Sequence, residues 1–367
     1  MNIDINYMYE ALKEAKKGFG NVTPNPYVGA IIVKNGKIIG RGAHLKYGEN
    51  HAEVNAIENC SESCKDADIY VTLEPCNHYG KTPPCSERII KEGFKRVIIG
   101  IRDYNSKVDG SGIKRLRESG IEVITDILKN ECFDINRHFF HHIGKKSSYF
   151  VMKSAITLDG AISTSSGSSK WITSQKSREL VHIYRLMFDA VLVGKNTVIS
   201  DNPSLTVRDP NGKKIGRTPY RVVIDEDLSL DLNYSLFSDP DRKKTIVFTT
   251  ERAKEYKVKQ FQDKGVNIYK VKSKDGFVDL SLVKEKLYNL NILSVLVEGG
   301  KMINTSLLKL NLIDRVHIFI APKLVGNGNS FVGDLGIDNM NKALTFEDKD
   351  FEFLGEDILF KATPKFQ

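Results

Sequence analysis

The sequence predicts an α/β protein with two domains. Its 367 residues exceed what one hydrophobic core usually organises, because single cores rarely grow beyond about 250–300 residues. Apolar runs typical of strands alternate with helix-like patterns, which is typical of layered α/β domains. The run Gly-Lys-Lys-Ser-Ser at 144–148 interrupts this alternation with small and charged residues. We therefore expect one domain over residues 1–146 and a second over residues 147–367.

The elements of the first domain follow from local patterns. Apolar residues recur at helical spacing from Met8 to Ala15, which predicts an N-terminal helix. Residues 28–42 predict a β-hairpin that turns at Asn35-Gly36, a pair typical of two-residue hairpin turns. The elements expected next are a helix over 52–60, a strand over 68–73, a helix over 84–93, a strand over 96–101, a helix over 112–120 and a strand over 121–126.

The second domain carries its own series of strand and helix candidates, which predicts a large sheet. No internal repeat or low-complexity segment is evident in the sequence. The candidate segments are 149–163, 177–188, 189–194, 220–225, 245–250, 266–271, 293–300, 302–310, 315–325 and 351–361.

Composition excludes several classes of protein. The apolar fraction of 41% is ordinary for a globular protein, and no run of 18 apolar residues predicts a membrane span. The N-terminus lacks the apolar core of a signal peptide, so we expect a cytoplasmic protein. The formal net charge of +8 comes from scattered basic residues. This pattern favours a small anionic substrate over nucleic acid.

Cysteine usage points to metal binding. The chain has five cysteines, and an odd number in a large chain of a reducing compartment argues against a disulfide framework. His51, Cys76 and Cys85 offer nitrogen and sulfur ligands, which zinc prefers. Three protein ligands would leave one position for a water, whose pKa zinc lowers from about 15.7 to about 7. Glu53, two residues after His51, could exchange a proton with that water.

Other assignments of these residues stay open. His78 could complete a structural zinc site as a fourth protein ligand, and iron is possible on ligand type alone. Cys60 and Cys64 have the spacing of one helical turn and could hold a metal, although two buried small side chains explain the spacing as well. His138, His141 and His142 also have helical spacing, but no acidic or cysteine partner is evident.

Two motifs together resemble a known family. His-Ala-Glu at 51–53, followed by Pro-Cys and a second cysteine, resembles the zinc deaminases of bases and nucleotides. Those proteins commonly have two residues between the cysteines, whereas this chain has eight between Cys76 and Cys85. The motif with this longer cysteine spacing, together with the segment 23–44, closely resembles the deaminase half of the bifunctional riboflavin-biosynthesis deaminase–reductases.

The resemblance implies a fold and a set of contacts for the first domain. It implies a cytidine-deaminase-like three-layer domain with zinc on His51, Cys76 and Cys85, and with Glu53 as the proton shuttle. It further implies that Asn25 and His44 line the pyrimidine pocket. Lys81 and Thr82 would lie near the substrate phosphate.

The second domain lacks a Gly-x-Gly-x-x-Gly motif but has an apolar strand, Glu298-Gly299-Gly300 and a helix. Glycines let the backbone approach a pyrophosphate, and a helix N-terminus attracts its charge. With the segments 151–163, 169–173 and 189–208, this motif resembles the reductase half of the same family. That resemblance implies a dihydrofolate-reductase-like fold and NADPH. Thr157 and Lys170 depart from the residues that the family often has there.

By this resemblance, particular residues contact the ligands of the second domain. The NADPH contacts implied are Ala155, Trp171, Thr197, Asp201, Gly300, Lys301, Met302, Ile303, Asn304, Thr305 and Ser306. The substrate contacts implied are Ser169, Arg185, Leu205, Arg208 and Glu298, with Lys153 and Asp201 as polar groups near the reacting carbon. Arginines suit a phosphate because the guanidinium group binds it in a bidentate way.

The sequence therefore predicts a bifunctional enzyme of riboflavin biosynthesis. The first domain would deaminate 2,5-diamino-6-(5-phosphoribosylamino)pyrimidin-4(3H)-one with zinc. The second would use NADPH to reduce the ribosyl side chain, giving 5-amino-6-(5-phosphoribitylamino)uracil. The family's habit favours a homo-oligomer. Two rival hypotheses are a nucleic-acid or nucleoside deaminase with an accessory domain, and a non-catalytic zinc module that binds a pterin- or flavin-like ligand.

Overall fold

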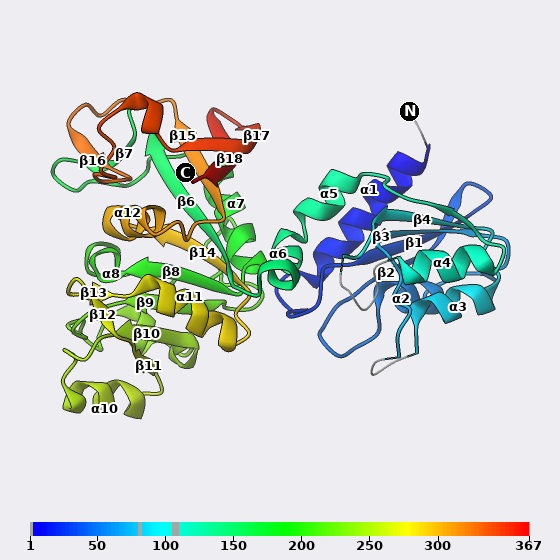
Figure 1. Ribbon diagram of the computed structural model, residues 1–367, viewed down its shortest axis with the longest axis horizontal. Coiled ribbons are helices and arrows are strands. Elements are labelled where there is room, and N and C mark those ends of the chain that lie inside the picture. Colours follow the sequence, from blue (N-terminus) through cyan, green and yellow to red (C-terminus); the bar gives the residue numbers. More distant parts are fainter. Residues whose placement is uncertain (1–2, 80–82, 105–109, 367) are drawn as a thin grey trace. The chain divides into compact units, whose positions relative to one another are not determined.

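The computed structural model describes residues 3–79, 83–104 and 110–366. The chain divides into two compact units between Lys146 and Ser147, and each unit has its own sheet (Figure 1). In the part of the chain that the structure describes, no helix combines the length and the apolar run that crossing a membrane requires.

The first unit alternates helices and strands around one sheet. Its elements are α1 (Ile3–Ala15), η1 (Lys16–Gly18), β1 (Gly29–Lys34), β2 (Lys37–Ala43), α2 (Ala52–Glu58), β3 (Asp68–Leu73), α3 (Cys85–Glu92), β4 (Arg96–Ile101), α4 (Ser111–Glu118), β5 (Glu122–Ile124), α5 (Lys129–Asp134) and α6 (Arg137–Lys145).

The sheet of the first unit has the strand order β2-β1-β3-β4-β5. β1 runs antiparallel to both β2 and β3, whereas β3, β4 and β5 are parallel. The predicted hairpin is confirmed, since β1 and β2 join at Asn35 and Gly36, both with positive φ. Parallel strands place their carboxyl ends at one edge, so residues that follow β3 and β4 lie near each other.

Helices cover both faces of this sheet. On one face α2, α3 and α4 contribute Ala56, Ile89 and Leu116 to a buried cluster. On the other face α1 contributes Met8 and Leu12, which pack against β1, β3 and β4. The first unit is therefore a three-layer α/β/α domain, as the sequence predicts.

The second unit is built around a larger sheet. Its elements are β6 (Tyr149–Thr157), β7 (Ala161–Thr164), α7 (Gln175–Met187), β8 (Ala190–Gly194), α8 (Lys195–Asp201), β9 (Tyr220–Ile224), α9 (Ser235–Ser238), η2 (Arg242–Lys244), β10 (Thr245–Thr249), α10 (Glu255–Asp263), β11 (Asn267–Lys270), β12 (Ser273–Lys274), β13 (Phe277–Val278), α11 (Leu280–Asn289), β14 (Ser294–Gly299), α12 (Lys301–Lys309), β15 (Arg315–Ala321), β16 (Gly328–Ser330), η3 (Met340–Lys342), β17 (Thr345–Leu354) and β18 (Asp357–Lys365).

Nine strands form this sheet in the order β11-β10-β9-β8-β14-β6-β15-β18-β17. The strands from β11 to β15 pair in parallel, and β18 and β17 complete the sheet in antiparallel pairing. Near-continuous apolar strands such as Ala190–Gly194 are typical of parallel sheets that are covered on both faces. Here α11 and α12 cover one face, and α8, α9 and α10 pack on the other.

Some segment boundaries differ from the sequence prediction. The candidate 149–163 is two strands, β6 and β7, and β7 pairs with β16. The candidate 351–361 contains the turn of a hairpin, because Gly355 has a φ of +71° between β17 and β18. Helix α2 ends at Glu58 instead of residue 60.

Candidate functional site

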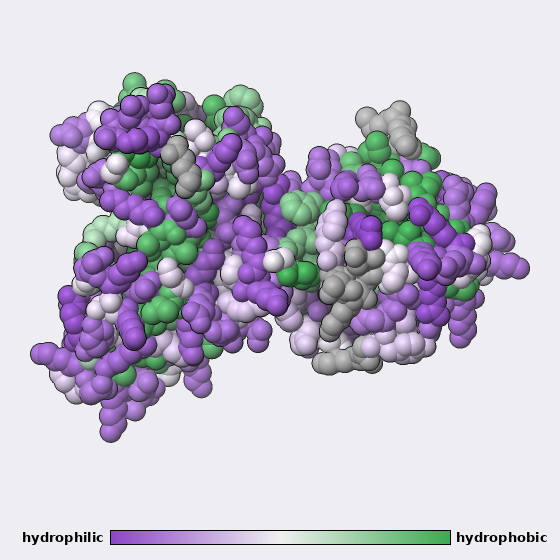
Figure 2. Space-filling view, in the orientation of Figure 1, coloured by the Kyte–Doolittle hydropathy of each residue, from purple (hydrophilic) through white to green (hydrophobic). Residues whose placement is uncertain are grey.

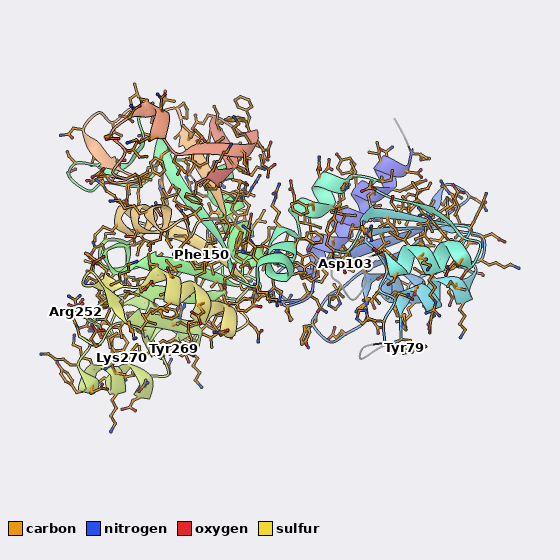
Figure 3. All side chains as sticks on the ribbon, viewed as in Figure 1. Tyr79, Asp103, Phe150, Arg252, Tyr269 and Lys270 are labelled. Carbon is orange, nitrogen blue, oxygen red and sulfur yellow. The ribbon has the colours of Figure 1, made fainter. Side chains whose placement is uncertain are left out.

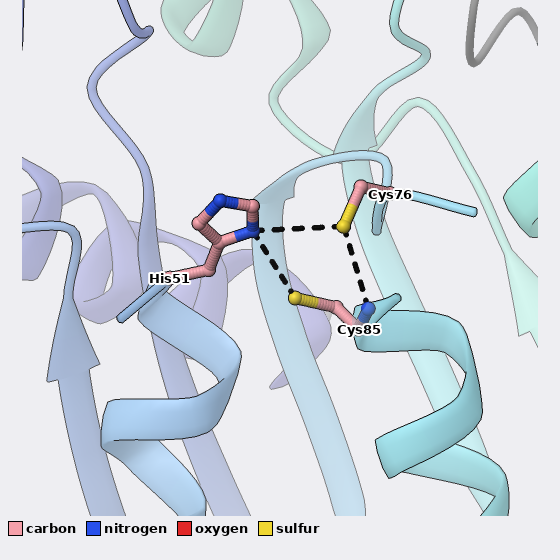
Figure 4. A group of neighbouring side chains, drawn as sticks. All are labelled: His51, Cys76 and Cys85. Carbon is pink, nitrogen blue, oxygen red and sulfur yellow. Dashed lines mark hydrogen bonds between the residues drawn. The ribbon is translucent and has the colours of Figure 1, made fainter. Parts of the chain in front are cut away.

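Three potential metal ligands from separate elements meet in the first unit (Figure 4). His51 is the N-cap of α2, Cys76 follows β3, and Cys85 is the first residue of α3. Their ligand atoms all lie within 4.8 Å of one another. His51 Nδ1 lies 3.3 Å from Cys85 Sγ and 3.6 Å from Cys76 Sγ. The helices that the sequence predicts from residues 52 and 84 begin at Ala52 and Cys85.

The spacing of these atoms fits zinc. Tetrahedral zinc binds nitrogen at about 2.0–2.1 Å and sulfur at about 2.3 Å, which places the two ligand atoms about 3.5 Å apart. The separations of 3.3 and 3.6 Å in the structure lie on either side of that value. Among the described residues, His78 lines the adjoining pocket but does not join the ligand group. A three-ligand set leaves one position of the tetrahedron open, as in catalytic sites.

The surroundings of Cys76 favour a thiolate. Its sulfur accepts a hydrogen bond from the Cys85 backbone N–H, 3.3 Å away, at the N-terminus of α3. Hydrogen bonding to the Cys85 side chain, with a contribution from His51, lowers the pKa of Cys76 well below its ordinary value. The positive end of the helix dipole acts in the same direction. A thiolate is the form of cysteine that binds a metal.

Glu53 lies in the first turn of α2 and is 3% exposed. Burial raises its pKa to about 7. A divalent cation beside the group would favour the carboxylate again, because opposite charge stabilises the ionised form. Glu53 is thus placed beside the ligand group without belonging to it.

A pocket of about 190 Å³ adjoins the ligand group, and Asn25, His44, His51 and Glu53 contribute to its lining. His44 Nδ1 lies 3.0 Å from the Asn50 carbonyl oxygen, so this nitrogen carries the proton. Its Nε2 therefore accepts from the Asn25 side-chain amide, 3.0 Å away. This bond fixes the orientation of the Asn25 amide, whose oxygen is left as the acceptor.

Two acidic residues at this pocket were not singled out from the sequence. Glu74 directly follows β3, and Asp103 (labelled in Figure 3) lies shortly after β4. Both are buried. The signal that could have found them is their position after neighbouring parallel strands, where sites of open α/β sheets are built.

In the second unit, the turn after β14 has the features of an anion site. Gly299 has a φ of +83°, and Gly300 is the N-cap of α12 with no side-chain capping bond. The first backbone N–H groups of α12 are thus available for a phosphate. Thr197 of α8 closes one side, since its Oγ1 accepts from Gly300 N–H at 3.3 Å. The Oδ1 atom of buried Asn304 has no hydrogen-bond partner within the described residues. These features fit a dinucleotide.

A charged cluster is formed by Glu298 near the end of β14, Lys153 of β6 and Arg185 of α7. Glu298 accepts two hydrogen bonds from Arg185, at 2.6 and 2.9 Å, and one from Lys153 at 3.5 Å. Burial favours the neutral form of Glu298, but the charges of Arg185 and Lys153 outweigh it and lower its pKa to about 2. The Arg185 guanidinium group is thus held by Glu298 in this structure.

Family comparisons agree with both halves of this description. Residues 1–101 match the family model of the cytidine and deoxycytidylate deaminase zinc-binding region. Residues 148–360 match the model of the RibD C-terminal domain. The second match alone covers more than half of the chain.

Relatives match over almost the whole length. The riboflavin biosynthesis protein RibD of Aquifex aeolicus is 44% identical over 97% of this chain and 97% of its own. The RibD of Actinobacillus pleuropneumoniae is 43% identical over 97% of this chain and 94% of its own. The chain belongs to the RibD family. It is a bifunctional deaminase and reductase of riboflavin biosynthesis with zinc and NADPH as its cofactors.

Solved RibD structures share the fold. Acinetobacter baumannii RibD superposes with a TM-score of 0.82 at 33% identity, covering 99% of each chain. A Thermotoga maritima protein has the same TM-score at 38% identity, also over 99% of each chain. Its description is diaminohydroxyphosphoribosylaminopyrimidine deaminase/5-amino-6-(5-phosphoribosylamino)uracil reductase. The predicted deaminase-like and reductase-like domains of RibD are therefore confirmed.

The structure brings most of the expected NADPH residues of RibD around one turn. Thr197 bonds Gly300, and Asn304 of α12 donates to Ser154, the neighbour of Ala155. The other residues of the 300–306 segment form the N-cap and first turns of α12. Asp201 ends α8. Trp171 lies between β7 and α7 and is 65% exposed, with Arg178 over its ring.

Other expected residues fall elsewhere. Ser169 is half-buried between β7 and α7, and Leu205 is buried with a φ of +51°. Arg208 donates to Thr206, Gly212 and Ser204, all of them neutral acceptors. Lys81 and Thr82 lie outside the described residues.

The alternative metal ligands do not form a group of three with one another or with acidic residues in the part of the chain that the structure covers. Cys60 and Cys64 do not share a helical turn, because α2 ends before them, yet their sulfurs lie 3.2 Å apart. The residues His138, His141 and His142 lie on α6.

Proposed function

We propose that this RibD family member deaminates 2,5-diamino-6-(5-phosphoribosylamino)pyrimidin-4(3H)-one and then reduces the ribosyl side chain to give 5-amino-6-(5-phosphoribitylamino)uracil. The observation that carries the proposal is the three-ligand group His51, Cys76 and Cys85 beside buried Glu53. The full-length likeness to the Thermotoga maritima protein described by these two activities supports the choice of substrate.

In the first reaction, water replaces the amino group on C2 of the pyrimidine, and ammonia leaves. A bound zinc supplies an activated water at neutral pH, and His51, Cys76 and Cys85 would hold the ion. Glu53 would accept a proton from the attacking water and deliver it to the leaving amino group. Asn25, fixed by His44, would present its carbonyl oxygen to an N–H group of the ring.

In the second reaction, a hydride and a proton reduce the opened aldehyde or imine form of the ribosyl group. NADPH supplies the hydride when bound, and the N-terminus of α12 would bind its pyrophosphate. Thr197 and Gly300 would shape the approach of the cofactor. Lys153 and the Arg185–Glu298 pair would orient the substrate. Arg208 would bind the substrate phosphate, because it makes no carboxylate pair among the described residues.

The direct test supplies the diamino nucleotide and NADPH to the purified chain and identifies products by mass, with metal content measured in the same preparation. We expect two products in succession. The mass of the first should correspond to replacement of an amino group by a hydroxyl group, and the mass of the second to the addition of two hydrogens. Turnover of cytidine or of an adenosine-containing RNA, without turnover of the diamino nucleotide, would contradict the proposal.

We also propose a homo-oligomer in the cytoplasm. Free cysteine thiols such as those of Cys76 and Cys85 persist in a reducing compartment. β17 is an edge strand that exposes Phe351 and Phe353 (64% and 78%) between charged residues such as Asp350 and Glu352, and green atoms lie beside purple ones in this region of Figure 2. Exposed apolar edge strands favour pairing with a second chain. Sedimentation should show an oligomer that Phe351→Ser with Phe353→Ser weakens; a monomer at every concentration would contradict this.

A further inference from the structure

Glu74 is a buried carboxylate that the chemistry described above does not use, and it is 4% exposed. Its Oε2 accepts from the backbone N–H groups of Asp103 and Gly110, both at 3.2 Å. Its Oε1 accepts from Gly112 at 3.1 Å and Ile113 at 3.2 Å. Four backbone donors satisfy the charge of this carboxylate, and among the described residues no basic side chain pairs with it. The carboxylate therefore ties the end of β3 to the segment after β4 and to the N-terminus of α4.

The contact between α4 and the Cys76 segment is also close in the backbone. A Cβ atom at Gly112 would lie 2.2 Å from the Pro75 carbonyl oxygen. Only glycine permits this approach, because no side chain atom fits in that space. Pro75 directly precedes Cys76, so the position of α4 fixes the position of one metal ligand.

Asn77 extends the same connection to the second cysteine. Its side-chain amide donates to the Ser111 carbonyl at 3.3 Å, and its oxygen accepts from Ser86 Oγ at 2.8 Å. Arg115 of α4 donates to Asn77 at 3.1 Å and to Glu87 at 2.9 Å. Ser86 and Glu87 follow Cys85 in the first turn of α3. Helix α4 thereby contacts the segments that carry both cysteines.

We propose that Glu74 is a positioning residue that holds the Cys76 segment, the pocket-wall residue Asp103 and the N-terminus of α4 as one rigid unit. The proposal rests on the deaminase function proposed above. Because Glu74 acts on both the metal side and the substrate side of the pocket, its loss should weaken zinc binding and substrate binding together. A residue that only stabilised the fold would lower the melting temperature and leave both affinities of the folded protein unchanged.

Glu74→Gln tests this proposal. The amide replaces one acceptor oxygen with an NH2 group that would face two backbone N–H donors. At a temperature well below melting, we expect the zinc dissociation constant, measured by competition with a chromophoric chelator, to rise about 10–100-fold. The deaminase KM should rise as well, while NADPH-dependent reduction stays unchanged.

Glu14→Gln is the matched control. Glu14 is a buried carboxylate of α1, 5% exposed, that pairs with Lys17 and Arg41. This variant should keep the zinc affinity and the KM. If Glu74→Gln does not fold, Glu74→Asp keeps the charge but withdraws the oxygens, and should change both constants in the same direction.

Zinc affinity and KM equal to those of the unsubstituted chain in a folded Glu74 variant would overturn the positioning role. If the unsubstituted chain itself bound no zinc, the proposed deaminase function would fail instead. The two failures are therefore distinguishable.

Discussion

At the scale of single residues, Glu53 shows how one side chain is prepared for proton transfer. Burial raises its pKa to about 7, whereas a cation on the adjoining ligand group would lower it. The side chain begins on α2 only two residues after His51, so helix geometry keeps it beside the ligand group. Its role in RibD chemistry can be separated from metal binding because it is not one of the three ligands.

Glu53→Gln should lower the rate of deamination about 10²–10⁴-fold, the usual contribution of a general acid–base group. Zinc content and NADPH-dependent reduction should stay unchanged. Ammonia release and metal analysis on one preparation check this expectation. Glu58→Gln, on the exposed end of the same helix, should have no effect. Undiminished turnover in Glu53→Gln would eliminate the proton relay.

Two arginines of the second unit differ in what they are free to bind. Arg185 makes a bidentate pair with Glu298, so its charge is already neutralised. Arg208 is exposed, and within the described residues its side chain bonds neutral oxygens alone. Charged hydrogen bonds to a substrate phosphate are therefore expected from Arg208.

Arg208→Ala should raise the KM of the reductase about 10–100-fold, because a hydrogen bond to a charged group contributes about 1.5–3 kcal/mol. Deamination should not change. Steady-state kinetics of the two reactions measure this, with the exposed Arg252→Ala as control. An unchanged reductase KM would remove Arg208 from the phosphate site.

At the scale of elements, the turn from β14 to α12 depends on a backbone that glycine favours. Gly299 has a φ of +83°, and a Cβ there would lie 3.0 Å from the Asn304 side chain. Asn304 in turn connects α12 to β6 through Ser154. A side chain at 299 would therefore crowd the Asn304 amide as well as strain the turn.

Gly299→Ala should destabilise the second unit by about 1–2 kcal/mol, the cost of a left-handed conformation for a residue with a side chain. It should also raise the NADPH dissociation constant. Gly276→Ala is a matched control, since Gly276 has a φ of +80° but open space around a Cβ. Denaturation and nucleotide fluorescence measure both effects. Equal NADPH affinity in the two variants would argue against a cofactor site at this turn.

At the scale of the whole molecule, the two candidate sites lie in separate compact units. The three potential metal ligands and Glu53 all lie before Lys146, and the turn at 299–300 lies after it. Within the described residues, each contact given for a site joins residues of one and the same unit. The two activities should therefore depend on their cofactors independently.

A zinc chelator should abolish deamination and leave NADPH-dependent reduction of the deaminated intermediate unchanged. Adding zinc back should restore the first activity. Parallel assays of the two half-reactions measure this, with chelator that is presaturated with zinc as the control. Equal loss of both activities would show that the reductase depends on the metal.

Local patterns in the sequence were enough for much of the fold. Alternating apolar segments identified most strands and helices, and Asn35-Gly36 identified the hairpin, because these signals depend on neighbouring residues. The apolar pattern did not predict a turn that lies within a single apolar run. The run over 351–361 forms a hairpin, because Gly355 turns the chain between β17 and β18.

The sequence by itself determined which residues are the candidate metal ligands and the candidate proton-transfer group, since His51, Glu53, Cys76 and Cys85 stand in recognisable motifs. Only the tertiary structure decided which other side chains lie beside these residues and hold their segments in place. Glu74 bonds Asp103 and the start of α4 because parallel β3 and β4 end at the same edge of the sheet. Such proximity depends on strand order and register, and no short stretch of sequence encodes either.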